Sequence, residues 1–482
     1  GDQRAARALM SPPESAARLA VGGAARSCLL LALTVAIFWR GGVSSEALLV
    51  VMGLGLLGWL LSWAVRPREL PRGRFAWLWL GFGVYTALQL IALPRGLLAV
   101  IAPQAVVISD QGRVALGLPP LAAMPLAVAW GDAALQCALA LGSAGMALTA
   151  ALTVQVDDGR RMMRQLAQFV VWLAVANGFL WLIAHEPHLA RFVPHSLSEQ
   201  AELLVFVNPN HQSALLLAGF ALALGQVLEV RGDRMRNVFA AAATFLGLAI
   251  LLVGSRSGIL IAFGALGLTG ATLPRPDRHM RRDEWERRAR VRQRWLLITL
   301  TVVVVLVVLA MPVLEVEFGV LGIKSLDRDT KVKTVSKVLP MIGDGWLFGQ
   351  APGTLPVRFG ALFPESITRV DFAENIIAQR LYDGGVWGGL PFLIVFGWLL
   401  AAMIRMKRHF QVYTPMWVAA SSVALANMTD FSLEVGGGLL LFFALALGAE
   451  RTWPTSRGSS RHGPSTTDVR LVLMGRVLSG LA

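Results

Sequence analysis

Four short polar segments interrupt the long apolar stretches of this chain, and they hold the residues best suited to chemistry. Ionisable and amide side chains are costly at membrane depth, so their presence there indicates function. The first segment, 206–212, contains Asn208, Asn210 and His211. Asn208 followed by Pro209 is also the pattern of a helix N-cap with proline at the first helical position. Helix capping and substrate binding are therefore both open for this segment.

The second segment, 254–258, is a tight turn of small residues around Arg256. It joins two apolar stretches without room for a loop, so Arg256 is expected close to the membrane surface. A guanidinium makes two hydrogen bonds to phosphate oxygens, and small neighbours let a bulky headgroup approach the backbone. The segment thus predicts a phosphate clamp, while an arginine that only reaches toward the headgroups is the structural alternative.

Carboxylates mark the third and fourth segments. The third places Glu374 and Asn375 at the start of an apolar helix, followed by Gln379 and Asp383. A carboxylate at a helix N-terminus is stabilised by the helix dipole, and this structural role competes with that of a general base at the membrane interface. The fourth segment adds Asp430 on the same expected face.

Long apolar helices must position these segments. Hydrophobic residues make up 55% of the chain and charged residues 15%, with a mean hydropathy of +0.60, whereas a soluble domain has about 25% charged residues. The apolar stretches are roughly 17 to 23 residues long, enough to cross a hydrocarbon core as helices. We therefore predict an all-α polytopic membrane protein with about twelve transmembrane helices, at 27–39, 45–65, 75–93, 134–155, 163–184, 212–229, 237–253, 257–273, 295–316, 375–404, 415–429 and 433–449.

Basic residues alternate from one connection to the next. One set of connections holds 22 arginines and lysines, whereas the short loops of the other set hold three, Arg40, Arg191 and Arg256. The positive-inside rule places the first set in the cytoplasm. Only one aromatic residue, Trp285, is interleaved with the basic clusters, which argues against binding of nucleic acid.

This charge pattern predicts the organisation of the whole chain. We expect a cytoplasmic N-terminal segment at 1–26, a transmembrane domain at 27–449 and a cytoplasmic tail at 450–482. Two semi-polar segments rich in glycine and proline, 94–133 and 317–374, are expected on the opposite side of the membrane. Their composition predicts short helices on the membrane surface and not a flexible linker.

Together the four segments resemble the superfamily of bacterial O-antigen ligases and O-antigen polymerases, membrane glycosyltransferases of the GT-C type. The family's small-residue turn Ser-Arg-Gly/Ser-Gly is matched by residues 255–258. Its pattern Ala-His-Asn-x-x-x-Gln-x-x-x-Glu-x-Gly-x-x-Gly is similar in spacing to Ala373, Glu374, Asn375, Gln379, Asp383, Gly385 and Gly388. Further likenesses lie at 88–94, 206–211, 340–353 and 430–433, so the resemblance extends over residues 75–449.

The resemblance implies a GT-C-like fold with a large periplasmic loop in the bacterial inner membrane. It implies transfer of an oligo- or polysaccharide from an undecaprenyl-pyrophosphate carrier to an acceptor on the periplasmic face, with no metal and no other cofactor. The acceptor would be lipid A-core for a ligase of lipopolysaccharide assembly, or a growing glycan for a polymerase. Membrane lipid is the remaining expected partner.

Site residues are assigned by the same resemblance. Glu374 and Arg256 are the expected catalytic residues, and the expected substrate-binding residues are Asn208, Asn210, His211, Asn375, Lys331, Arg191 and Asp430. Glu374 stands where the family has histidine, and Pro209 stands where it has arginine. The second cation for the pyrophosphate is therefore open among the basic residues expected on the same side, Arg191, Arg328, Lys331 and Arg369.

Other functions remain open. Within the family, a ligase, a polymerase and a protein O-oligosaccharyltransferase differ in the acceptor, which binds the variable external loop. Outside it, a transporter or flippase of lipid-linked glycan and a scaffold of an envelope complex are the rivals. A transporter places charges near the bilayer midplane along interrupted helices, whereas these ionisable residues are expected at one outer face, which favours chemistry there.

Overall fold

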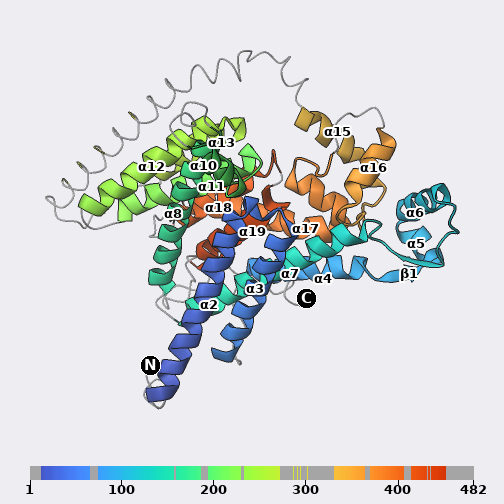
Figure 1. The fold of residues 1–482 in the computed structure, drawn as a ribbon, viewed down its shortest axis with the longest axis horizontal. Coiled ribbons are helices and arrows are strands. Elements are labelled where there is room, and N and C mark those ends of the chain that lie inside the picture. Colours follow the sequence, from blue (N-terminus) through green and yellow to red (C-terminus); the bar gives the residue numbers. More distant parts are fainter. Residues whose placement is uncertain are drawn as a thin grey trace, which may run out of the picture.

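The protein is mostly helical (Figure 1). Its computed structural model describes Glu286, Arg290, Arg294 and Thr301 and the ranges 12–65, 74–156, 159–185, 194–229, 233–271, 330–363, 370–406, 414–430, 432–434 and 436–451. The long helices are α2 (Pro12–Phe38), α3 (Ser45–Val65), α4 (Arg74–Gln89), α7 (Trp130–Val156), α8 (Gly159–His185), α11 (Pro209–Glu229), α12 (Asp233–Val253), α13 (Arg256–Ala271), α17 (Ile376–Met406), α18 (Thr414–Ala426) and α19 (Gly436–Arg451).

A helix occupies each predicted transmembrane range except 295–316, of which all but Thr301 lies outside the described residues. Within the described part of the chain, four helices are long and apolar enough to cross a membrane: Ala20–Phe38, Ser45–Trp63, Met162–His185 and Asp233–Val253. The prediction of a helical membrane protein is therefore confirmed. The number of about twelve spans stays a prediction.

Two helices begin earlier than the predicted ranges. Helix α2 begins at Pro12 and runs without a break past residue 26, so the expected N-terminal segment is not separate from the first long helix. Its first residues include several alanines and arginines, which favour a helix, and proline is tolerated in a first turn. Helix α7 begins at Trp130, inside the segment expected to end at 133, with Asp132 in the first turn, where a carboxylate is favourable.

Short elements lie in the described parts of both semi-polar segments. The first holds α5 (Arg95–Ile101) and α6 (Pro103–Ala115), flanked by strands β1 (Ala92–Pro94) and β2 (Ala123–Pro125), which pair antiparallel. The second holds α15 (Thr330–Gly343) and α16 (Thr354–Leu362); its parts 317–329 and 364–369 lie outside the described residues. The other short elements are η1 (Arg40–Gly42), α10 (His195–Leu203) and η3 (Ser432–Glu434).

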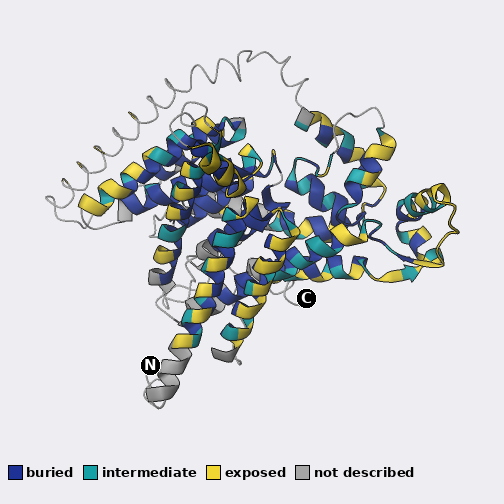
Figure 2. Ribbon diagram, in the orientation of Figure 1, coloured by how far each residue is buried: buried dark blue, intermediate teal, exposed yellow. Residues whose placement is uncertain are grey.

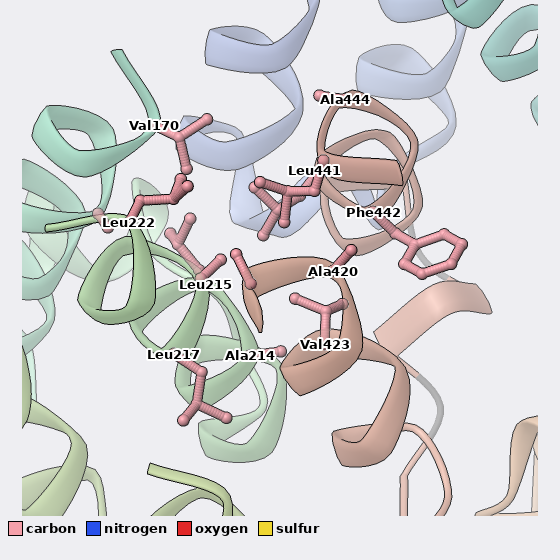
Figure 3. Close-up of a cluster of buried hydrophobic side chains, with 14 of the residues drawn as sticks. Val170, Ala214, Leu215, Leu217, Leu222, Ala420, Val423, Leu441, Phe442 and Ala444 are labelled. Atoms are coloured by element: carbon pink, nitrogen blue, oxygen red, sulfur yellow. The ribbon is translucent and has the colours of Figure 1, made fainter. Parts of the chain in front are cut away.

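Helix α11 is the centre of the core (Figures 2 and 3). It is buried on all sides from His211 to Ala223 and packs against α8, α12, α13 and α18. Leu215 and Leu217 belong to one cluster of buried apolar side chains with Val170 of α8 and Ala420 and Val423 of α18. A helix that is apolar all round is buried in this way. Its first turn, where the polar segment 206–212 lies, is therefore held rigidly.

Candidate functional site

The first turn of α11 uses its asparagines in local hydrogen bonds. Asn208 occupies the N-cap position: its Oδ1 accepts the backbone N–H of Asn210 at 2.8 Å, and its carbonyl accepts that of Gln212 at 3.0 Å. Pro209 is the first residue of α11. These bonds satisfy N–H groups that a helix start leaves without partners. They fix the backbone that leads into His211.

The Ser-Arg-Ser-Gly turn lies against that first turn. Ser255 donates its hydroxyl to Asn210 Oδ1 at 2.9 Å and accepts the backbone N–H of Gly258 at 3.3 Å. A Cβ at Gly258 would lie 1.9 Å from Ser213 Oγ and 3.0 Å from Ser213 Cβ, so a larger residue there would displace the Ser213 side chain. Arg256 is the first residue of α13. Its side chain lies outside the described structure.

Lys331 contacts two of the predicted site residues, and one of these contacts a third. We call Lys331, Glu374, Asp430 and His211 the Lys331 cluster. Lys331 Nζ lies 3.0 Å from Glu374 Oε2 and 3.3 Å from Asp430 Oδ1, and it donates to the carbonyl of Thr429 at 3.0 Å. His211 Nε2 lies 3.7 Å from Asp430 Oδ1.

Burial differs sharply across the Lys331 cluster. The side chains of His211 and Asp430 are 4% and 3% exposed, whereas those of Lys331 and Glu374 are 34% and 23% exposed. The cluster therefore has a buried wall and an open side. A ligand approaching from solvent would meet Lys331 and Glu374 first.

Glu374 is held in an unusual backbone conformation. Its φ is +56°, in the left-handed region that residues with a Cβ rarely adopt. The neighbours fix it on both sides, because Ala373 donates its N–H to Gln379 Oε1 at 2.7 Å and Asn375 caps α17 through bonds from the N–H groups of Ile377 and Ala378. Such strain is found most often at functional sites.

The loop 427–430 is attached to the start of α17. Asn375 Nδ2 donates to the carbonyl of Met428 at 2.7 Å, and the backbone N–H of Ile376 donates to the carbonyl of Asn427 at 3.0 Å. Asn427 in turn donates to Ser432 Oγ at 2.8 Å. These bonds set Asp430 beside Glu374, so the contact of both carboxylates with Lys331 depends on the folded loop.

A second charged cluster lies deeper and was not predicted. We call Arg380, Asp383, Glu434 and Gln379 the Arg380 cluster. Arg380 lies 2.7 Å from Glu434 Oε2 and 3.8 Å from Asp383 Oδ2, and all three side chains are at most 2% exposed. Gln379 donates to Asp383 Oδ1 at 2.9 Å. Aromatic rings cover the guanidinium, at 4.7 Å for Phe82, 5.2 Å for Phe392 and 5.6 Å for Trp79.

Helix α17 is interrupted just after this cluster. Gly385 has φ +59° and ψ −152°, a conformation open essentially to glycine alone. The loop 345–351 lies against the interruption: Gln350 and Ala351 donate their N–H groups to the carbonyls of Tyr382 and Asp383 at 2.8 and 3.0 Å. The carbonyl groups freed by the interruption thus have partners, as a polar backbone away from water requires.

The predicted site residues are thus partly brought together. Lys331, Glu374, Asp430 and His211 form one cluster, and Asn208, Asn210 and Asn375 hold the backbone around it. Two predicted site residues remain: Arg256 has its backbone at the start of α13 and its side chain outside the described structure, and Arg191 lies outside the described residues. The two other candidates for the second cation, Arg328 and Arg369, also lie outside the described residues. Among the residues that the structure describes, no three His, Cys, Asp or Glu side chains are grouped as a metal site would require.

Comparisons with known proteins leave the family open. No protein-family model matches the chain, and no curated protein matches it either.

Proposed function

We propose that the protein transfers a glycan from an undecaprenyl-pyrophosphate carrier to an acceptor at the Lys331 cluster. One observation carries the proposal: Lys331 and Glu374, a cation and a carboxylate on the open side of the cluster, lie 3.0 Å apart. The Ser-Arg-Ser-Gly turn of Arg256 is bonded to Asn210, the residue before His211 of the same cluster. A pyrophosphate leaving group needs positive charge, and an acceptor hydroxyl needs a base.

The reaction assigns a task to each of these side chains. Glu374 takes the proton of the acceptor hydroxyl while the oxygen of that hydroxyl forms a bond to the anomeric carbon of the glycan. The bond between that carbon and the phosphate oxygen breaks, and the carrier pyrophosphate leaves with the electron pair. Lys331 and Arg256 stabilise the negative charge that develops on the pyrophosphate.

The Lys331–Glu374 ion pair describes the state before the donor binds. A pyrophosphate carries more negative charge than one carboxylate, and Lys331 has a flexible, one-third exposed side chain that can turn toward it. Glu374 then loses its cationic partner and becomes available to accept a proton. When the pyrophosphate leaves, Lys331 returns to its contact with Asp430, which lies with His211 on the buried side of the cluster.

The membrane location and the acceptor belong to this proposal. We place the protein in the bacterial inner membrane with the Lys331 cluster facing the periplasm, because the arginine-rich connections favour that orientation. The acceptor is lipid A-core in a ligase of lipopolysaccharide assembly, or a growing glycan in an O-antigen or exopolysaccharide polymerase. Deletion of the gene distinguishes these: carrier-linked polymer accumulates uncapped for a ligase, and single repeat units accumulate for a polymerase.

Transfer by the purified protein tests the proposal directly. In detergent, with a carrier-linked glycan and a crude lipid A-core fraction, Glu374→Gln should slow transfer about 10²- to 10⁴-fold, the usual contribution of a positioned base. Lys331→Gln should slow it too, whereas Lys333→Gln, an exposed lysine on the same helix, should leave it unchanged. Transfer at the parental rate by Glu374→Gln would refute the role of Glu374.

A transporter of lipid-linked glycan is the second candidate. The interruption of α17 at Gly385 beside the buried Arg380 cluster favours it, because transporters place charges along interrupted helices. Reconstituted protein would then move a fluorescent carrier-linked glycan across vesicles without forming a new glycosidic bond. Such movement, unchanged in Glu374→Gln, would support the transporter and contradict the glycosyltransferase.

A further inference from the structure

A small unit stands apart from the helical bundle (Figure 1). It consists of β1, α5, α6 and β2, residues 92–125, and we call it the α5–α6 unit. Leu98, Ala105 and Met124 form its interior, and Phe348 and Ala351 from the loop beside the interruption of α17 belong to the same apolar cluster. The α5–α6 unit is thus a folded element with a fixed attachment to that loop.

Much of this unit is exposed (Figure 2), and its exposed surface is unusually apolar. Val100 is 80% exposed, Leu116 75% and Val114 67%. The exposed large apolar residues of the unit are Leu97, Val100, Val107, Val114, Leu116, Leu118 and Leu121. A water-facing surface rarely groups so many apolar side chains, and such a group indicates a partner.

The charged side chains of the unit are used within it. Both terminal nitrogens of Arg95 donate to the carboxylate of Asp110 at 2.5 Å, and Arg113 donates Nε to the carbonyl of Pro119 at 2.6 Å. The hydrogen bond from Arg95 lowers the pKa of Asp110, so this carboxylate remains paired and charged near neutral pH. These are the only charged residues between 92 and 125. The surface therefore combines apolar side chains with a small net positive charge.

We propose that the α5–α6 unit is seated in the membrane interface, with its exposed apolar side chains among the lipid acyl chains. The exposed apolar surface of α4, at Val84 and Leu88, continues through Ile91 into the unit. On its other side the unit leads into α7, which packs along α3, one of the helices long and apolar enough to cross the membrane. A net positive, apolar element of this kind binds at the boundary of headgroups and acyl chains.

This seating has a consequence for the interruption of α17. Phe348 packs against the unit, and its carbonyl accepts hydrogen bonds from Tyr85 at 2.7 Å and Gln89 at 3.0 Å. The unit therefore holds the loop 345–351 at a fixed depth relative to the lipid surface. The inference does not depend on the proposed transfer reaction.

Spin labels on the full chain in liposomes containing anionic lipid test the seating. The buried native cysteines Cys28 and Cys137 are replaced by alanine, and labels are placed at Val100→Cys or Leu116→Cys. Ser336→Cys, an exposed position on α15, is the matched control. We expect labels at 100 and 116 to be relaxed more by oxygen, which partitions into lipid, than by a water-soluble nickel chelate, and the control to show the reverse.

Two results would overturn the proposal. Labels at 100 and 116 relaxed mainly by the nickel chelate would place the unit in water. Labels shielded from both reagents and coupled to one another between molecules would show that a second copy of the chain covers the surface. Because both positions are highly exposed, the labels should not disturb folding; a helical circular dichroism spectrum equal to that of the cysteine-free protein verifies this.

Discussion

Replacement of Arg380 by methionine should destabilise the protein more than replacement of either of its carboxylate partners. The guanidinium faces Glu434 at 2.7 Å and Asp383 at 3.8 Å, so it compensates two buried carboxylates at once. Arg380→Met leaves both without a cation. Glu434→Gln leaves Arg380 still paired with Asp383 and keeps an amide in place of the carboxylate.

The magnitude follows from burial. Removing one partner of a buried ion pair costs about 3–5 kcal/mol, and the side chains of this cluster are at most 2% exposed, so Arg380→Met belongs at the upper end. Glu434→Gln loses one charge-assisted hydrogen bond, about 1.5–3 kcal/mol. The two variants should therefore differ by about 2 kcal/mol in the free energy of unfolding. Combining Arg380→Met with Asp383→Asn and Glu434→Gln removes all three charges and should recover most of the loss.

Thermal unfolding of the detergent-solubilised protein, followed by size-exclusion chromatography, measures this order. The parental protein should unfold at the highest temperature, followed by Glu434→Gln and then Arg380→Met, with the triple variant above Arg380→Met. Equal midpoints for Arg380→Met and Glu434→Gln would show that the guanidinium does not compensate both carboxylates. A triple variant no more stable than Arg380→Met would show that the aromatic contacts of the guanidinium, and not its charge, stabilise the cluster.

Three further results are expected. Gly385→Ala should lower the unfolding temperature, because the new Cβ would lie 2.5 Å from the carbonyl group of Leu347 and residue 385 has a φ of +59°. Gly360→Ala, whose Cβ would have no atom within 4 Å, should leave the unfolding temperature unchanged. Equal effects of the two variants would refute the strain at Gly385. The Arg95 hydrogen bond lowers the pKa of Asp110 from 3.8, so its contribution to stability is present above that value and lost as the pH falls through the lower folded pKa. The difference in unfolding temperature between the parental protein and Asp110→Asn should shrink below about pH 4, and a pH-independent difference would contradict this. Ser336→Cys should react with an impermeant maleimide added to cells whose outer membrane is permeabilised. Reaction only after lysis of the inner membrane would show that α15 lies on the cytoplasmic side, opposite to the proposed topology.

The apolar stretches of the sequence predict where the long helices lie. The residues at which these helices begin and end are seen only in the structure. Helix α2 extends to Pro12 through residues that are too polar for a span yet have good helix propensity. Helix α7 likewise begins before its apolar stretch, at Trp130. Hydropathy measures the part of a helix that crosses lipid, and the helical backbone does not stop where the lipid ends.

Part of the candidate site could be predicted because each residue lies in a recognisable motif. The contact of Lys331 with Glu374 and Asp430 could not, since it depends on how α15 and the loop 427–430 pack against α17. The sequence pattern does not single out Arg380, because this residue lies at the start of a long apolar stretch. Its spacing of three residues from Asp383, on one face of a helix, was the available signal.

The interruption at Gly385 bears on the order in which the protein is assembled as it leaves the ribosome. The loop 345–351, which supplies its hydrogen-bond donors, is synthesised before α17, so the exposed carbonyl groups find partners as soon as they emerge. Arg380 must wait for one of its partners, because Glu434 is synthesised after α17. Until then Asp383, one turn away on the same helix, is the counter-charge that the nascent helix carries with it. Glu434 is therefore the last of the three charged side chains to join the Arg380 cluster.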